Sequence, residues 1–526
     1  MILLVKVIKN LINKKMIILH KKHPTMFFKK ISLKNFHFII LILAVVIYFI
    51  TALNSLGYYH ADEHYQIIEF AGKKLGTHTE KDLAWEYKAN IRSAIQPMLC
   101  VMSFKILGLF NITNPYTKTF FLRMLSGLFT LLIINFFIRT TISNIHISYQ
   151  RAYILLSYFL WFLPFLSVRF SSETWSGIMF LLSLALIQSK MRDTPRYIFT
   201  GLAFGLCFLF RFQTAILSLG LLAWLLLIKK ENIITLIKIV LPGLFIVLLG
   251  VFIDYWFYEK PVLTFWNYIR VFLQNSNGDS DFGISPWYYY IYQIINLPTI
   301  FIGIPLLVSL IFIIYKKRLS IYLWCILPFI FIHSIIPHKE ERFLFPIVFL
   351  FPVILISGYQ ELIILIKKNQ IKNTLNILFA IIFMVVNIIG LTIMSQEPAG
   401  LGRMVITKYI HDNYKNQPVH LIYCPSANPY DPWECLPEKF YLEKNMKFSG
   451  IKTLWDYNEN LLLPNYTNLI VIIKCDFEKS ENKELLNHYR FILKKQSISP
   501  LIEKINKYYN GFDDRHVLFL YSYGGA

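Results

Sequence analysis

The chain has 526 residues, of which 56% are hydrophobic and only 16% are charged, and its mean hydropathy is +0.49. A soluble domain carries about 25% charged residues, so this composition excludes an ordinary soluble protein and predicts an integral membrane protein. The net charge of +22 would suit a nucleic-acid-binding protein, but the charges of residues 395–526 nearly balance, with 16 Lys and Arg against 15 Asp and Glu. The excess therefore lies in the apolar part, where basic clusters beside apolar runs are typical of membrane helices, and we expect no nucleic-acid partner.

Residues 1–36 carry nine Lys and no acidic residue. Their apolar stretch is short and repeatedly broken by Lys, whereas a cleaved signal peptide has an uninterrupted apolar core. We therefore expect a basic cytosolic N-terminal arm with an interfacial helix.

Eleven apolar runs follow, several of them near the ~20 residues that a helix needs to cross ~30 Å of hydrocarbon. We predict membrane spans over residues 37–57, 119–138, 151–168, 174–189, 197–210, 213–228, 234–254, 297–315, 320–336, 343–366 and 374–394. These spans make residues 37–394 an all-α transmembrane domain. The run 96–110 is apolar but short, and we interpret it as a re-entrant or interfacial helix.

The loop charges orient these spans. With the N-terminal arm in the cytosol, the short basic loops at 139–151, 190–196, 229–230, 316–318 and 367–372 all fall on the cytosolic side, as the positive-inside rule requires. The opposite side then receives the first outer loop, 58–118, the loops 169–173, 255–297 and 338–342, and the tail from 395 onwards. Counting 96–110 as a full span would reverse every later loop.

The tail, residues 395–526, is polar and predicts a small α/β domain on the non-cytosolic side. Strands are expected at 420–423, 468–474 and 517–523, and a helix at 482–494, with Pro- and Asn-rich turns between them. No CxxC pair is present, which leaves little support for zinc or thioredoxin-type chemistry. Three cysteines lie in apolar runs and are expected to pack in the core, and three lie in the tail: Cys100, Cys207 and Cys325, then Cys424, Cys435 and Cys475.

The first outer loop begins with two adjacent carboxylates, Asp62 and Glu63, directly after a predicted span. Carboxylates at such a boundary face water or are costly to desolvate, which makes them functional candidates, and one of them could accept a proton from a sugar hydroxyl. A helix cap with a solvated face would give the same pattern. His60 and His64 would share a helix face and could bind a metal with these carboxylates, but polar interface histidines explain this weak motif as well.

Two further stretches combine aromatic and charged residues. Trp85, Glu86 and Arg92 lie in the first outer loop, and Trp287 lies among tyrosines in a later outer loop. Such residues suit sugar faces and phosphates, and equally an aromatic belt at the membrane interface.

Between the ninth and tenth spans, five charged or titratable residues stand in a row, from His338 to Arg342. Lys339 and Arg342 would be strong donors to a lipid phosphate, although a tight loop that anchors two helices would also account for them. Arg211 is a lone cation between two short spans, and either faces an internal cavity or extends to the interface.

Taken in order, these segments resemble the glycosyltransferase family 22 enzymes, which use dolichyl-phosphate-mannose as donor. The His-Pro-Asp-Glu motif of that family is matched by residues 60–63 without its proline, and His-Lys-Glu-x-Arg-Phe is matched by residues 338–343. Trp-Glu with Arg-Ser, and a Pro-Trp before aromatics, are matched at 85–86, 92–93 and 286–287. The Cys-Pro and Cys-Leu-Pro segments at 424–425 and 435–437 resemble those of the enzymes that add the third mannose of the glycosylphosphatidylinositol (GPI) anchor.

The resemblance implies a GT-C fold and an inverting, metal-independent transfer of mannose without a cofactor. The acceptor hydroxyl would attack the anomeric carbon of a β-linked lipid-phosphate mannose and give an α-mannoside. The partners would be the lipid-linked donor, a glycolipid or lipid-linked glycan acceptor and membrane lipids, in the endoplasmic reticulum membrane of a eukaryote or the inner membrane of a bacterium. The implied roles are catalytic base for Asp62, with Glu63 second; donor-phosphate binding for His338, Lys339, Arg342 and Arg211; and substrate binding for His60, His64, Gln66, Trp85, Glu86, Arg92 and Trp287.

Two alternatives stay open. A bacterial enzyme of the same fold could transfer another lipid-phosphate sugar to an envelope glycan. A transporter would show repeated halves and charged residues within its spans, and neither is clear here. In the tail, we also expect Cys424 and Cys435 to form a disulfide, because the topology places them in an oxidising compartment; two free buried thiols are the alternative.

Overall fold

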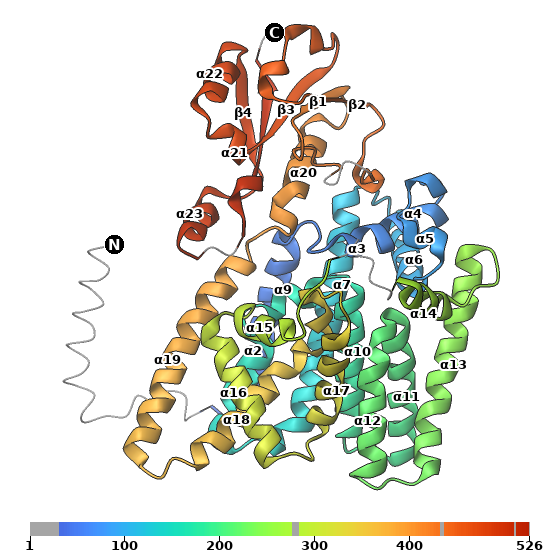
Figure 1. Cartoon of the computed structure of the whole chain (residues 1–526), viewed down its shortest axis with the longest axis vertical. Coiled ribbons are helices and arrows are strands. Elements are labelled where there is room, and N and C mark those ends of the chain that lie inside the picture. The colour runs from blue at the N-terminus through green and yellow to red at the C-terminus, as the bar shows by residue number, and fades with distance from the viewer. Residues whose placement is uncertain (1–30, 276–282, 432–435, 510–511, 525–526) are drawn as a thin grey trace.

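The computed structural model describes residues 31–275, 283–431, 436–509 and 512–524. A helical bundle forms the lower part of the molecule in Figure 1, and a domain built on a β-sheet stands above it. The predicted N-terminal arm lies outside the described residues except for its last six. The first helix among the described residues, α2, begins at Leu33 after the N-cap Ser32, whose side chain accepts a hydrogen bond from the backbone of Asn35.

Helices occupy all eleven segments predicted to cross the membrane. In chain order they are α2 (Leu33–Asn54), α7 (Pro115–Thr141), α8 (Gln150–Phe159), α9 (Leu163–Val168), α10 (Ser172–Ile187), α11 (Asp193–Phe210), α12 (Ala215–Leu227), α13 (Ile233–Tyr258), α16 (Ile300–Lys316), α17 (Ile321–Ile335), a 3₁₀ segment (Glu341–Leu350) that leads into α18 (Phe351–Ile364), and α19 (Asn369–Met394). The third predicted span is broken into α8 and α9, where Leu160 and Trp161 interrupt the helix.

Not every one of these helices is long enough to cross a bilayer. Among the described residues, five are long and apolar enough, and the pair α16 and α17, bent by 119° at its break, makes up to six. The other predicted spans have 18 residues or fewer, below the ~20 residues of a full crossing. The helical membrane bundle is therefore confirmed, whereas the count of eleven crossings stays a prediction.

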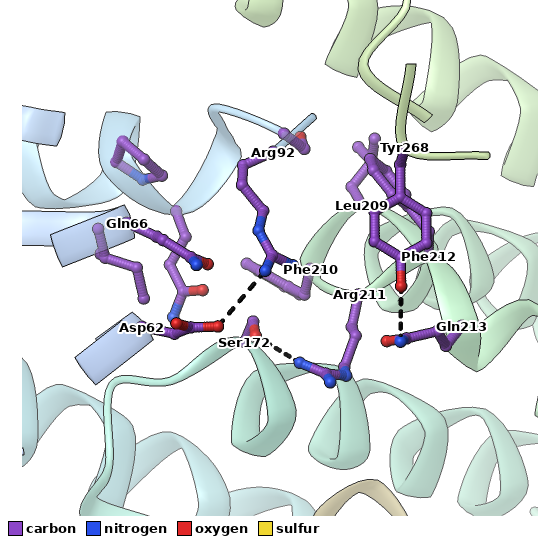
Figure 2. A pocket seen from close by; sticks show the side chains of 14 residues that line it. Asp62, Gln66, Arg92, Ser172, Leu209, Phe210, Arg211, Phe212, Gln213 and Tyr268 are labelled. Carbon is purple, nitrogen blue, oxygen red and sulfur yellow. Dashed lines mark hydrogen bonds and ion pairs between the residues drawn. The ribbon is translucent and has the colours of Figure 1, made fainter. Parts of the chain in front are cut away.

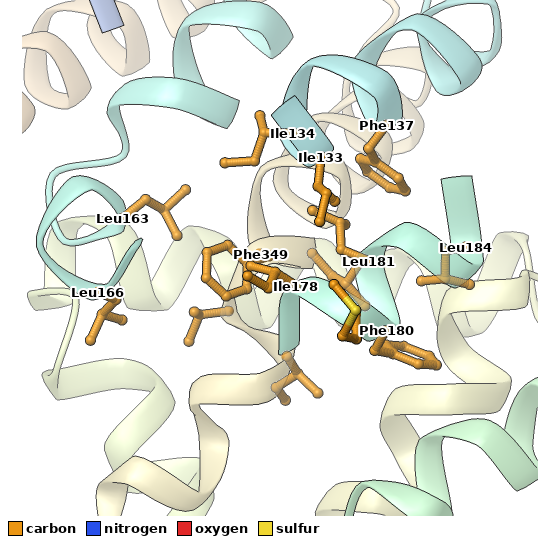
Figure 3. Packing of buried hydrophobic residues seen from close by; sticks show 14 of the residues in the cluster. Ile133, Ile134, Phe137, Leu163, Leu166, Ile178, Phe180, Leu181, Leu184 and Phe349 are labelled. Carbon is orange, nitrogen blue, oxygen red and sulfur yellow. The ribbon is translucent and has the colours of Figure 1, made fainter. Parts of the chain in front are cut away.

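The core of the bundle lies where α7, α9, α10 and the 3₁₀ segment meet. Figure 3 shows Ile178 and Leu181 of α10 packed between Ile134 of α7 and Phe349 of the 3₁₀ segment. Close approach is possible because Gly177 faces Pro346: a Cβ at this glycine would lie 2.8 Å from the Pro346 Cα. This packing fixes the first turn of α10 beside the start of the 3₁₀ segment, which matters for the site.

Short helices lie over one end of the bundle, beneath the sheet domain (Figure 1). In the first outer loop they are α3 (Ala61–His64), a π-helical turn (Tyr65–Glu69), α4 (Phe70–Lys74), α5 (Trp85–Ala89) and α6 (Ile95–Leu109); in a later loop they are α14 (Thr264–Asn275) and α15 (Tyr289–Asn296). The run that we interpreted as re-entrant or interfacial is α6.

The tail forms the predicted α/β domain. Its five-stranded sheet has the order β2-β1-β3-β5-β4, in which β1 pairs in parallel with β2 and β3, and β5 pairs antiparallel with β3 and β4. The strands are β1 (Val419–Tyr423), β2 (Met446–Gly450), β3 (Thr467–Ile473), β4 (Phe491–Gln496) and β5 (Leu518–Tyr523), and the helices are α20 (Arg403–Tyr414), α21 (Lys474–Phe477), α22 (Ser480–His488) and α23 (Pro500–Tyr509).

One prediction in this domain is wrong. The helix expected over 482–494 ends at His488, and its second half is strand β4. Arg490, with a φ of 57°, turns the chain, and the following residues pair with β5 at the edge of the sheet. Pairing with a distant strand overrides the local helical pattern here.

Candidate active site

The two adjacent acidic residues at the start of the first outer loop, Asp62 and Glu63, lie in a short helix. His60 is the N-cap residue of α3, and its Nδ1 lies 3.3 Å from the backbone nitrogen of Asp62. The helix passes directly into the π-helical turn Tyr65–Glu69, a rare conformation that is frequent at functional sites. Asp62 and Glu63, in the turn before it, line two different cavities.

Asp62 lines a cavity with about 500 Å³ of empty space, part of it open to solvent. Figure 2 shows Asp62 and Gln66 on one wall, Arg211 with Phe212 on the opposite wall, and Arg92 between them. The first outer loop, the start of α10 and the junction of α11 and α12 thus all contribute. The full lining is Asp62, Gln66, Ile67, Arg92, Ser93, Gln96, Pro97, Ser172, Leu209, Phe210, Arg211, Phe212, Gln213 and Tyr268.

Arg342 joins this cavity's acidic wall to the loop between α17 and α18. One terminal nitrogen lies 2.6 Å from Asp62 and 3.3 Å from Glu173. The Nε lies 2.5 Å from Glu340. The guanidinium therefore holds three carboxylates in fixed positions, a geometry that suits its planar fork of donors. Only 6% of Arg342 is exposed.

Glu173 connects this cluster to the opposite wall. Its carboxylate lies 2.5 Å from Arg211. The Arg211 guanidinium also lies over the Phe343 ring, 4.9 Å from its centroid, and donates a hydrogen bond to the Ser172 hydroxyl at 3.3 Å. Glu173 is 3% exposed. A buried carboxylate of this kind is stable only when it is paired, and here it is shared by two arginines.

The pairing sets the charge state of the wall. Burial alone would raise the pKa of Asp62, but the hydrogen bond from His60 and the charges of Arg342 and Arg92 hold that pKa well below its ordinary range. Burial would likewise lower the pKa of His60, yet its bonds to Asp62 and Glu340 raise that pKa to about 9. At neutral pH, Asp62 is therefore a carboxylate that faces a cavity with two cations, Arg92 and Arg211.

Glu63 is in a different environment. It lines a second cavity with about 350 Å³ of empty space, part of it open to solvent, and has Arg169 as its nearest cation, at 3.8 Å. Burial raises the pKa of Glu63 to about 7, and the attraction of Arg169 only partly opposes this. The two neighbouring carboxylates, which the sequence does not distinguish, thus differ in both charge and access.

Several predicted substrate residues lie at or beside the first cavity. Gln66 lines it and donates a 2.8 Å hydrogen bond to Glu86. His60 lies 3.2 Å from Glu340, and His338 lies 2.9 Å from the same carboxylate. Both histidines therefore belong to the carboxylate cluster around Arg342.

Other predicted residues lie elsewhere. Lys339 lines neither cavity, because its ammonium donates to the backbone carbonyls of Ser285, at 2.8 Å, and Pro337. Trp85 and Trp287 are 48% and 69% exposed and line neither cavity. Arg342 also lies behind the lining of the first cavity. Of the four residues predicted to bind the donor phosphate, only Arg211 faces that cavity.

His64 is part of a buried polar network between the first outer loop and the tail domain. It lies 2.6 Å from Glu69, which also pairs with His78 and accepts a hydrogen bond from the backbone of Phe440 at 3.1 Å. The tail contributes a second acid, Glu438, to which the Tyr58 hydroxyl donates at 2.5 Å. Burial raises the pKa of Glu438 to about 7. The tail domain is thus fastened to the loop that carries Asp62.

Sequence reasoning missed four charged residues in and around these two sites. Glu173, Arg169 and Glu340 were placed in outer loops but given no role, and Arg123 was read as part of a span. A signal was present for the first two, since the loop 169–173 is charged at both ends although it joins two apolar runs on the same side as Asp62. Arg123 gave a weaker signal as a cation within an apolar helix.

The remaining predictions concern cysteines and metals. Cys424 is buried, but Cys435 lies outside the described residues, so the disulfide stays a prediction. Within the described residues, His60 and His64 do not converge, and no group of three His, Cys, Asp or Glu side chains could hold a metal ion. Metal independence is likewise still a prediction.

A model of the Alg9-like mannosyltransferase family matches residues 38–422. GPI mannosyltransferase 3 of Candida albicans is 26% identical over 293 residues, which cover 55% of this chain and 57% of that protein. The protein of the same name from Debaryomyces hansenii is 25% identical over 402 residues, which cover 70% of this chain and 67% of that protein. The matches thus span roughly half to two thirds of these relatives.

Among solved structures, ArnT from Cupriavidus metallidurans, which is bound to undecaprenyl phosphate, superposes with a TM-score of 0.52 at 11% identity. The similarity covers 92% of this chain and 97% of that chain. A likeness of this extent shows the fold. The predicted GT-C architecture, with its helical membrane bundle and a C-terminal sheet domain, is confirmed.

Proposed function

Since the chain belongs to the Alg9-like mannosyltransferase family, a family of glycosyltransferases, we propose that it transfers mannose from a polyprenyl (dolichyl) phosphate mannose to a glycolipid acceptor with inversion at the anomeric carbon. The observation that carries this proposal is the first cavity. An ionised carboxylate, Asp62, whose side chain is 17% exposed, faces the guanidiniums of Arg92 and Arg211 across a single space. A transfer from a phosphate leaving group needs this combination of a base and anion-binding cations.

The reaction assigns each of these groups a task. The acceptor hydroxyl attacks the anomeric carbon of mannose, the bond from that carbon to the phosphate oxygen breaks, and the hydroxyl proton passes to Asp62. Polyprenyl phosphate leaves with the bonding electrons, and Arg211 and Arg92 neutralise its charge. This differs from our expectation for Lys339 and Arg342, because neither of them faces the cavity.

A carboxylate with a depressed pKa is a weak base, and this suits the proposed step. The hydroxyl becomes acidic only as its oxygen bonds to the anomeric carbon, so the proton moves late. Until then, an ionised Asp62 directs the hydroxyl by accepting its hydrogen bond. Arg342 and His60 act as positioning residues, because they fix the carboxylate without lining the cavity.

For the acceptor, we propose a GPI-type glycan that receives an α-1,2-linked mannose at the endoplasmic reticulum membrane. Two relatives named GPI mannosyltransferase 3 support this choice.

The test is a transfer assay on membranes from cells that express the chain. Membranes are incubated with labelled polyprenyl-phosphate mannose and, in parallel, with GPI precursors and lipid-linked oligosaccharides, and the products are analysed by mass and by linkage-specific mannosidases. We expect one added hexose on a GPI precursor that α-1,2-mannosidase removes. A product on the lipid-linked oligosaccharide alone would change the acceptor, and no mannose transfer to any acceptor would refute the proposed function.

A further inference from the structure

The second cavity has no role in the reaction as derived so far. It lies between α7, the segment that follows α2, and the tail domain, and it is separated from the first cavity by the Asp62–Glu63 pair. About 350 Å³ of empty space, part of it open to solvent, lies within its lining. The lining is Gly57, Tyr58, Glu63, His64, Ile68, Thr119, Leu122, Arg123, Arg169, Phe170 and Tyr441.

Two arginines give this cavity an excess of positive charge. Arg169 is 1% exposed and is anchored on the Ser55 hydroxyl at 2.7 Å and the Gly57 carbonyl at 2.9 Å. Its nearest carboxylate, Glu63, is 3.8 Å away. Glu63 is the only acidic residue in this lining. His64, which also lines the cavity, is already paired with Glu69.

Arg123, the second arginine of this cavity, is a buried cation that lies outside the ion pairs of the described residues. It is 5% exposed, and its Nε donates to the Ala52 carbonyl at 2.7 Å. Within the described ranges, none of the ion pairs includes Arg123, whereas Arg211 and Arg342 each contact carboxylates. A buried cation without a counter-charge is costly. The cost is recovered if an anion enters the cavity and accepts hydrogen bonds from both guanidiniums.

The rest of the lining suits a sugar beside that anion. Tyr58, Phe170 and Tyr441 present aromatic surface to the cavity, and such rings pack against the apolar faces of sugars. Tyr441 comes from the tail domain, so an occupant of this cavity would touch both domains of the protein.

From this arrangement we infer that the second cavity is an anion-binding subsite, in which Arg123 and Arg169 receive a phosphoryl group carried by the acceptor glycolipid. The inference rests on the proposed function for the identity of the acceptor. The donor phosphate is assigned to Arg92 and Arg211 in the first cavity, and each substrate thus has its own pair of arginines. The Asp62–Glu63 pair lies between them, where the acceptor hydroxyl must meet the anomeric carbon.

Phosphate binding is tested first, without any turnover. The purified protein in detergent is titrated with phenyl phosphate by isothermal calorimetry, and we expect two classes of site. Arg123→Met should weaken one class at least tenfold, and Arg211→Gln should weaken the other. Arg123→Lys, which keeps the charge, should retain binding within about threefold. Arg139→Gln, in the same helix but exposed, is the matched control.

Kinetics then distinguish the two possible sources of the phosphate. In the transfer assay, Arg123→Met should raise the apparent KM for a phosphorylated acceptor about tenfold and leave the KM for the donor unchanged. A raised donor KM instead would assign the cavity to the donor and overturn the inference, as would unaltered phenyl phosphate binding by folded Arg123→Met. Loss of a phenyl phosphate site in Arg123→Met, in a protein whose wild type transfers no mannose, would refute the proposed function and leave the anion site standing.

Discussion

Replacing Arg342 with lysine tests whether this residue positions Asp62 or binds the donor. The guanidinium contacts Asp62 at 2.6 Å, Glu173 at 3.3 Å and Glu340 through both its Nε at 2.5 Å and a terminal nitrogen at 3.0 Å. An ammonium is a point charge that cannot span all three carboxylates. At least one charge-assisted hydrogen bond is therefore lost, and such a bond is worth about 1.5–3 kcal/mol.

If the lost hydrogen bond leaves Asp62 poorly positioned in the transition state, kcat should fall roughly ten- to a hundredfold. The donor KM should change by less than about threefold, because Arg342 does not line the cavity. Activity is measured per folded molecule with labelled polyprenyl-phosphate mannose, after size-exclusion chromatography. Arg318→Lys, at an exposed position between α16 and α17, is the control for the effect of the exchange itself.

Two outcomes would refute this reasoning. A donor KM that rises tenfold or more at nearly normal kcat would return Arg342 to the phosphate site that we first expected for it. Normal values of both constants would show that the three carboxylates hold their positions without the guanidinium.

Three further predictions follow from the site and the tail. The pKa of Glu63 in the folded protein is about 7, above the ordinary 4.5, so the free energy of unfolding of the wild type should fall by about 3 kcal/mol as the pH rises from about 4.5 through 7. In a thermal-shift assay between pH 5 and 8, the melting temperature of Glu63→Gln should therefore fall less than that of the wild type. Equal decreases would contradict the assigned burial of Glu63. EDTA should leave mannose transfer unchanged, and activity that is lost on chelation and restored by Mn²⁺ or Mg²⁺ would reveal a metal requirement. Cys424 and Cys435 should resist alkylation until they are reduced, and mass analysis that finds both alkylated without a reductant would exclude the disulfide.

The sequence predicted the architecture well because long apolar runs and clusters of loop charges are strong signals for membrane helices and their orientation. Apolar runs and loop charges placed helices in all eleven segments and put Asp62, Arg211 and Arg342 on one side, where the structure brings them together. Hydropathy does not show where a helix breaks or bends, however. Breaks such as the one between α8 and α9, and the 119° bend between α16 and α17, depend on packing against neighbours.

The sequence identified several residues of the site correctly, but it did not predict which role each of them has. Arg342 and Lys339 look alike in a basic loop, yet one contacts three carboxylates and the other donates to backbone carbonyls. Glu173 remained unassigned because its partner Arg211 comes from a different pair of helices. Such pairings depend on how helices pack: Gly177 against Pro346 places α10 beside the segment that carries Arg342, the other partner of Glu173, and no local sequence pattern predicts this contact.

The most direct test of the account compares Asp62→Asn with Glu63→Gln in the purified protein. Both changes replace a carboxyl group by an amide and keep the shape of the side chain, but only Asp62 faces the cavity that contains Arg92 and Arg211. Loss of a general base typically costs about 10²–10⁴-fold in rate. We expect a loss of this size in turnover per folded molecule for Asp62→Asn, and a decrease of less than about tenfold for Glu63→Gln. Near-normal turnover in Asp62→Asn, together with an inactive and folded Glu63→Gln, would contradict the assignment and transfer the role of base to Glu63.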